Sequence, residues 1–192
     1  MTTTTLKAKS SADFLAALPR LTGMIAPGSI YLVPFTGARA AGSVRTDLPT
    51  ARMLTGDSVF EFKLWMREFA KLAAMFDTAA IIMHTTETLT EQPWDSPHGR
   101  LAGALSELFA SAETTVRELC VIGEDGWCSF ATEQTPQLCS HEEILHSPLY
   151  DPELQLLDLN AWRAAHPGNT TEDAAEIRHL YDRMMQDAAT IA

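Results

Sequence analysis

The chain has 192 residues, of which 46% are hydrophobic and 20% are charged, and its formal net charge is −11. This length and composition are those of an ordinary globular protein with a substantial core, which argues against wholesale disorder. The acidic balance argues against direct binding of nucleic acid and against an anionic membrane surface, because both need clustered Lys and Arg.

The N-terminal MTTTTLKAKS lacks the apolar stretch that export needs, and no window approaches the length of a membrane span. Three cysteines in a chain of this size do not make a disulfide framework. We therefore expect a cytoplasmic protein, and we interpret residues 1–9 as a flexible tail.

The first fifty residues are predicted to form a helix followed by two strands. Ser10 and Asp13 have the S-x-x-D spacing of a capping box, and Gly23 suits the end of the helix. Ser29–Phe35 is a run of β-forming residues, and Arg39–Asp47 is predicted to return as a second strand after a Thr-Gly turn.

Four segments share a wider pattern, namely SADFLAALPRLTG, PGSIYLVPF, VRTDLP and the later VRELCVIGEDGWCSF. They resemble the opening helix, the next two strands and the W-x-S-[FY] hairpin of the actinobacterial domain-of-unknown-function family 4192. The resemblance covers about three-quarters of the chain and departs after Phe130, where a cysteine-dense segment is expected and only Cys139 is found. It implies an α/β domain and a bacterial or phage source, and it implies no activity.

The middle of the chain alternates between helix and strand. After a connector at 50–56, the spacing Ser58-x-x-Glu61 begins a helix whose apolar residues step by three and four: Val59, Phe62, Met66, Phe69, Ala73 and Phe76. Thr78–His84 is nearly all apolar, as in a strand covered on both faces, and we place it at the centre of the sheet. A connection of about fifteen residues follows, and Ser96-Pro97 begins the next helix.

The last strands and the C-terminal third complete the predicted fold. A hairpin joins Val116–Ile122 to Trp127–Ala131, and short helices are predicted at His141–His146, at Glu153–Ala165 and from Thr170 onward. This order predicts an α/β fold, with α+β as the alternative, built on a mixed sheet of about five strands. Residues 10–140 would form the sheet domain, and residues 141–192 a helical extension that packs on this domain or projects from it.

His84 is the first candidate for chemistry, because open α/β sheets bind ligands beyond the carboxyl ends of their strands. Glu87 and His98, on the connection that follows, are the residues that would complete an acid/base or metal cluster. The competing interpretation is a strand-end histidine that is hydrogen-bonded to a neighbouring backbone group.

Arg45 and Asp47 are two residues apart on one strand, so their side chains point to the same side. They are a candidate binding site for an anionic ligand. The alternative is a structural ion pair, in which Arg45 binds Asp13 or another carboxylate.

Cys128, Cys139 and His141, with His146, contain ligand atoms that suit zinc, but the spacing C-x10-C-x-H-x4-H fits none of the usual ligand pairs. We predict no metal, and these residues are only weak candidates. Cys128 is also a candidate nucleophile, whereas Cys120 lies in an apolar strand and is interpreted as core. The sequence contains no phosphate-binding or dinucleotide-binding glycine motif, and we expect no cofactor.

These observations favour a non-catalytic module that binds another protein or a second copy of itself. The predicted contacts are the 85–99 connection, in which Trp94 either faces a partner or folds back on the sheet edge, and the acidic segment 168–192. The alternative is a small-molecule hydrolase or transferase with His84 as the acid/base group. A third hypothesis is an acidic inhibitor that imitates DNA.

Overall fold

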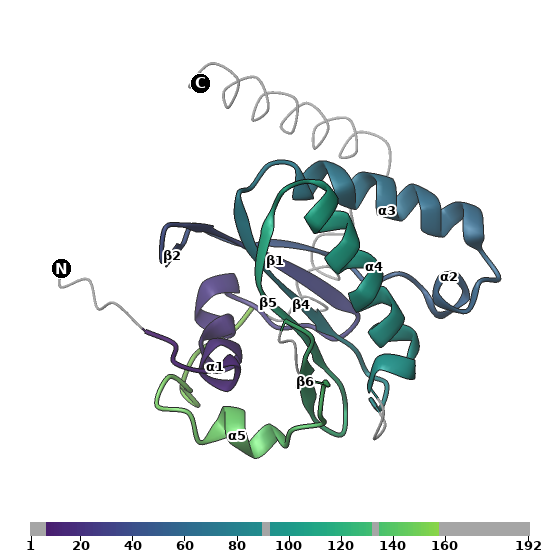
Figure 1. The fold of residues 1–192 in the computed structure, drawn as a ribbon. Helices are drawn as coiled ribbons and strands as arrows, with labels where there is room; N and C mark the ends of the chain where they lie inside the picture. Colours follow the sequence, from purple (N-terminus) through teal and green to yellow (C-terminus); the bar gives the residue numbers. More distant parts are fainter. Residues whose placement is uncertain (1–6, 90–92, 132–134, 158–192) are drawn as a thin grey trace. The chain divides into compact units, whose positions relative to one another are not determined.

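The structure is a computed structural model, and it describes residues 7–89, 93–131 and 135–157 (Figure 1). The chain divides into two compact units, Met1–Leu156 and Leu157–Ala192. All the helices and strands below belong to the first unit. No helix among the described residues is long and apolar enough to cross a bilayer.

The described elements alternate between helices and strands along the first unit. In chain order they are α1 (Ser11–Thr22), β1 (Ser29–Thr36), β2 (Arg39–Ala40), β3 (Val44–Asp47), α2 (Ala51–Thr55), α3 (Val59–Ala73), β4 (Thr78–His84), the 3-10 helix η1 (Pro93–Asp95), α4 (Pro97–Ser111), β5 (Thr115–Ile122), β6 (Trp127–Ser129) and α5 (His141–Leu145).

The strands form one mixed sheet with β4 at its centre, as the apolar run Thr78–His84 predicts. The strand order is β2-β1-β4-β5-β6, and β3 also pairs with β1. β1 runs antiparallel to β4, whereas β5 runs parallel to β4 and forms a hairpin with β6. The parallel pair β4 and β5 is joined through α4, the crossover that this type of pairing requires. The α/β prediction is therefore confirmed.

Helices cover both faces of the sheet (Figure 1). On the side that we call the α4 face, α3 and α4 pack on the strands through Phe69, Ala73, Leu101, Leu105 and Phe109. On the other side, the α1 face, α1 contributes Phe14, Leu15 and Leu18, and α5 contributes the partly buried Ile144. Because successive strand residues alternate between faces, Ile81 and Met83 of β4 belong to the α4 face, and Ala80 and Ile82 to the α1 face.

Local sequence signals account for several element ends. The Ser10 hydroxyl accepts from the Asp13 amide, and α1 ends at Gly23 with φ +70°. The Asp13 carboxylate, however, accepts from the Lys9 amide, so the predicted capping box closes one residue further out. Ser96 caps α4 by accepting from the Gly99 amide, as predicted.

The prediction of a single strand over Arg39–Asp47 is wrong. The segment divides into β2 and β3, because two residues of β1 face three residues between Ala40 and Val44. Gly42 lies in this break with φ +142°, a conformation that glycine adopts readily. The division is the reason that the sheet has six described strands instead of about five.

Two further predictions need correction. The connector at 50–56 contains the short helix α2. The predicted helix from Glu153 does not begin there, because residues 152–153 form a turn and residues 154–157 have no regular structure. The rest of that helix and the helix predicted from Thr170 lie outside the described residues. Within the predicted extension, residues 141–156 belong to the same compact unit as the sheet.

One buried hydroxyl ties the ends of α3 and α4 together. Thr114 is buried, and its Oγ1 lies 2.8 Å from the carbonyl oxygens of both Ala73 and Phe76. Ala73 is the last residue of α3 and Phe76 lies just after the turn that follows it, at the helix end where carbonyls run out of partners within the helix. The sequence contains no signal for this contact, since the residues are about forty positions apart.

We expect Thr114→Val to lower the free energy of unfolding by about 1–3 kcal/mol, because valine keeps the shape but removes the hydroxyl donor that the Phe76 carbonyl shares with the Ala73 carbonyl. The measurement is urea denaturation. Thr115→Val, at the neighbouring exposed position, is the matched control and should change stability little. Equal stabilities of the two variants would contradict the role assigned to Thr114.

Candidate functional site

A row of polar side chains crosses the α1 face at one end of the sheet. The register places Asp47 of β3 opposite Ser29 of β1, and Ser29 opposite His84 of β4. Side chains directly opposite each other on neighbouring strands lie on the same face with Cβ atoms about 4.5–5.5 Å apart. The structure therefore places His84 and Asp47, which the sequence identified separately, in one row on either side of Ser29, which the sequence analysis missed.

Arg45 connects two members of this row. Its Nε donates to the Ser29 hydroxyl at 2.9 Å, and its Nη2 lies 2.6 Å from Oδ1 of Asp47. Ser29 is fully buried, whereas the Asp47 side chain is largely exposed. The carboxylate that pairs with Arg45 is thus Asp47, and the guanidinium acts as a brace across β1 and β3.

Asp13, the other carboxylate proposed for Arg45, binds a different part of the chain. It accepts from the Ser147 hydroxyl at 2.6 Å and from the Lys9 amide at 3.0 Å. These two hydrogen bonds, that of Ser147 first, lower the pKa of Asp13 below its ordinary value. A second link is the ion pair between Arg20 and Asp151, with 2.7 Å between Nη2 and Oδ2. Both contacts fasten the segment after α5 to α1.

His84 has an unusual environment at the end of β4. Its Nδ1 is buried and has no hydrogen-bond partner among the described residues. Burial lowers the pKa of the imidazole, and the nearby His141 lowers it further. His141 itself is anchored by its Nε2, which lies 3.0 Å from the Gly123 carbonyl oxygen. At neutral pH this environment favours an uncharged His84, which can accept a proton or a hydrogen bond.

Glu87 and His98 form a separate pair. Oε2 of Glu87 lies 3.6 Å from Nδ1 of His98. Burial lowers the pKa of His98, and the Glu87 carboxylate opposes this shift. His98 lies in the first turn of α4, which covers the α4 face, whereas strand alternation places His84 on the α1 face. The three candidate catalytic residues therefore form two groups on opposite faces.

The cysteines are distributed between the two faces. Cys120 belongs to the α1-face core and Cys128 to the α4-face core. Burial is the main cause that raises the pKa of Cys128 to about 12, and burial also raises the pKa values of Cys120 and Cys139. High thiol pKa values disfavour the thiolate that nucleophilic attack and metal binding require. The described residues contain no group of three or more His, Cys, Asp or Glu side chains that is arranged to hold a metal ion, so Cys128, Cys139 and His141 do not form one.

The connection after β4 presents Trp94 on a braced turn. Within this turn, the Ser96 hydroxyl donates to the Pro93 carbonyl at 2.6 Å and accepts from the Gly99 amide at 2.9 Å. A Cβ at Gly99 would come within 2.1 Å of the Pro93 carbonyl oxygen, so η1 packs directly on the first turn of α4. The Trp94 side chain is nevertheless 40% exposed. The turn is fixed, and its aromatic ring faces solvent in part.

Comparison with known proteins finds no matching family model, no matching curated protein and no matching solved structure. The resemblance to family 4192 stays a prediction.

The His84 environment predicts how stability depends on pH. The pKa of His84 is lower in the folded chain than its unfolded value of 6.5, so the unfolded chain binds more protons between the two values. The free energy of unfolding should therefore rise with pH up to about 6.5 and level off above it. His98 acts in the same direction.

We expect His84→Gln to reduce the loss of stability between about pH 7 and pH 5, measured by urea denaturation at each pH. His146→Gln, at an exposed position of the segment that follows α5, is the control and should leave the pH dependence unchanged. An unaltered pH dependence in the His84 variant would show that this imidazole is not a source of it.

Burial also predicts the order in which the cysteines react. In the native chain at neutral pH, a thiol reagent should modify the partly exposed Cys139 before the buried Cys120 and Cys128. Mass mapping of partially labelled protein measures this order. In a Cys139→Ser variant, labelling should stay slow until urea is added. Rapid modification of Cys128 would instead support its role as a nucleophile.

Proposed function

We propose that the chain is a non-catalytic protein-binding module whose contact is centred on Trp94 in the 85–99 connection. The observation that carries this proposal is an indole that is 40% exposed although the backbone beneath it is held by hydrogen bonds and close packing. A large aromatic ring of this kind is typical of the residues that contribute most to binding between proteins.

The rigidity of the turn supports a binding role in energetic terms. Binding costs free energy when flexible side chains and loops must become ordered, and a turn that is already fixed avoids most of this cost. Next to Trp94, the Arg100 guanidinium donates to the Asp95 carbonyl at 2.7 Å, which closes the turn from the helix side. The Asp95 and Arg100 side chains provide polar groups at the edge of the contact.

The partner in this proposal is another protein or a second copy of the chain, in the cytoplasm, and neither nucleic acid nor a membrane. The net charge of −11 supports the exclusion of polyanionic partners. The segment 168–192, which the sequence analysis proposed as a second contact, lies outside the described residues.

A hydrolase or transferase centred on His84 is the second candidate. It is favoured by one observation, the imidazole at the carboxyl end of the central strand whose buried Nδ1 has no hydrogen-bond partner among the described residues. The residues proposed to assist it do not support this candidate, because His98 and Cys128 belong to the opposite face of the sheet.

Native mass spectrometry of the full chain purified from its own host tests the leading proposal. We expect a bound protein or a second copy in the wild type, and its loss in Trp94→Ala, because alanine removes the aromatic contact without changing the turn. Leu145→Ala, which truncates an exposed apolar side chain on α5, is the control and should retain the partner. A retained small molecule, or a partner that still binds Trp94→Ala, would contradict the proposal.

A further inference from the structure

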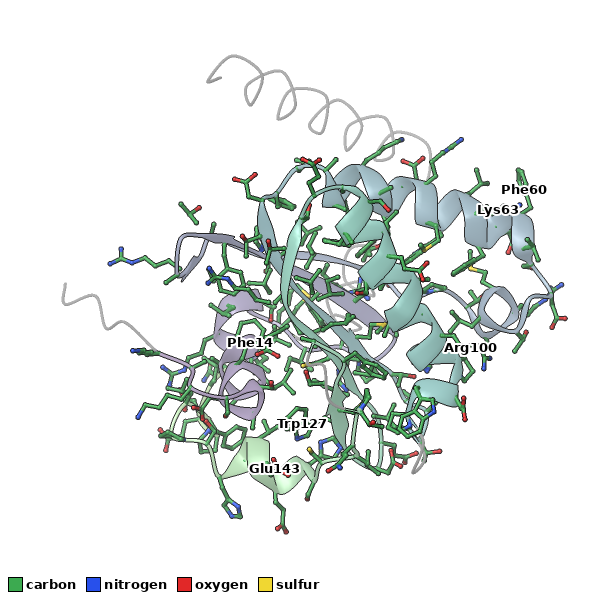
Figure 2. The ribbon with its side chains drawn as sticks, viewed as in Figure 1. Phe14, Phe60, Lys63, Arg100, Trp127 and Glu143 are labelled. Carbon is green, nitrogen blue, oxygen red and sulfur yellow. The ribbon has the colours of Figure 1, made fainter. Side chains whose placement is uncertain are left out.

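The side of α3 that faces away from the sheet carries a second distinctive surface. The helix buries Phe69 and Ala73 against the α4 face, and Phe62, Trp65 and Met66 pack partly against the same core. The opposite side holds residues that step by three and four along the helix, and we call them the α3 ridge: Phe60, Lys63, Leu64, Arg67 and Lys71. Figure 2 shows Phe60 and Lys63 together at the outer end of α3.

Phe60 is the most exposed large apolar side chain of the described residues, at 74%. Its neighbour Val59 is also more than half exposed, at 52%. A single exposed apolar residue is common on protein surfaces and needs no explanation. Phe60 differs because it lies at the start of the α3 ridge, where three cations follow it over about three turns of the same helix.

The positive and negative side chains of α3 lie on different sides of the helix. All three cations of the helix belong to the ridge, whereas Glu61 and Glu68 project from one flank of it. Glu68 pairs with Lys71 at 2.5 Å and with Arg67 at 3.2 Å, and all three side chains are more than half exposed. Exposed pairs of this kind contribute little free energy, so the cations can exchange Glu68 for another carboxylate at small cost.

We propose that the α3 ridge docks an acidic amphipathic helix of a partner protein. The ridge is basic on a chain whose net charge is −11, so its electrostatic complement is an acidic segment. A straight row of side chains along three turns matches the spacing of another helix, whose apolar residues would contact Phe60 and Leu64 while its carboxylates meet the cations.

The same charges argue against other occupants. A symmetric contact between two copies through this face would place the two basic ridges opposite each other, which is electrostatically unfavourable. Nucleic acid carries phosphates along its whole length and would bring them close to the acidic remainder of the chain, whereas a short helix can keep its carboxylates at the cations and its apolar residues at Phe60 and Leu64. The inference is independent of the contact proposed at Trp94, since it rests on a different helix.

The test uses the full chain with a photo-cross-linking amino acid at position 60, expressed in its own host. We expect the cross-linked peptide, identified by mass spectrometry, to belong to another protein, to carry net negative charge and to have apolar residues at helical spacing. A synthetic copy of that peptide should bind the purified full chain, and its affinity should fall as the salt concentration rises.

Substitutions then test whether the peptide binds to the ridge or to another part of the surface. Phe60→Ala should weaken binding of the synthetic peptide about tenfold or more, and Arg67→Glu about fivefold or more. Arg39→Glu makes the same charge change on the exposed strand β2 and should have a much smaller effect. All these positions are exposed, and circular dichroism checks that each variant is folded.

Several outcomes would overturn the inference. They are a cross-link to nucleic acid, lipid or this chain itself, a cross-linked peptide without net negative charge, and the lack of any cross-link. Equal binding by Arg67→Glu and Arg39→Glu would do the same. Trp94→Ala should leave binding of the synthetic peptide unchanged, so the outcome at this ridge and the outcome at Trp94 are separable.

Discussion

The structure depends on the burial of β4 between two strands and two helical layers. β4 pairs with β1 along one edge and with β5 along the other, and Ala79–Met83 have no exposed surface. Each fully buried Ile or Met side chain contributes about 1.5–3 kcal/mol relative to exposure. Ala79 and Ala80 at the start of the strand leave room for the packed helices, while Ile81, Ile82 and Met83 fill both sides of the core. The register of the neighbouring strands is fixed as a consequence, because a slip of one residue would reverse these faces.

This register determines which polar residues meet at the end of the sheet. Because Ser29 lies opposite both Asp47 and His84, these three residues and Arg45 share the α1 face, beneath the segment that carries His141. Because successive strand residues alternate between faces, Cys128 lies on the α4 face. Helix α4, which contains His98, covers that same face. The sheet thus separates His84 from His98 and Cys128, and Arg45 braces β3 to Ser29 of β1.

The two helices on the α4 face bring aromatic residues to the surface near their first turns. Trp94 precedes α4 on a turn that is packed against that helix, and Phe60 lies at the start of α3, beyond the part that reaches the core. The inner sides of α3 and α4 pack on the sheet. Residues on their outer sides can therefore vary without loss of the fold. The binding proposals for Trp94 and for the α3 ridge both concern residues outside these packed sides. The two surfaces are separate, and the positive charge of the α3 ridge suits an acidic partner.

Features that depend on neighbours within a few residues could be predicted from the amino-acid sequence. Apolar spacing predicted α3 and α4, a nearly all-apolar run predicted β4, and cap chemistry predicted the starts of helices at Ser10 and Ser96. The i, i+2 spacing predicted that Arg45 and Asp47 lie on one side. Three features emerged only from the folded chain: the break at Gly42, the buried contacts of Thr114, and the row in which Ser29 lies opposite His84. These features join positions from different strands or helices. They follow from the register and packing that burial of the whole sheet selects, and no local pattern encodes that choice.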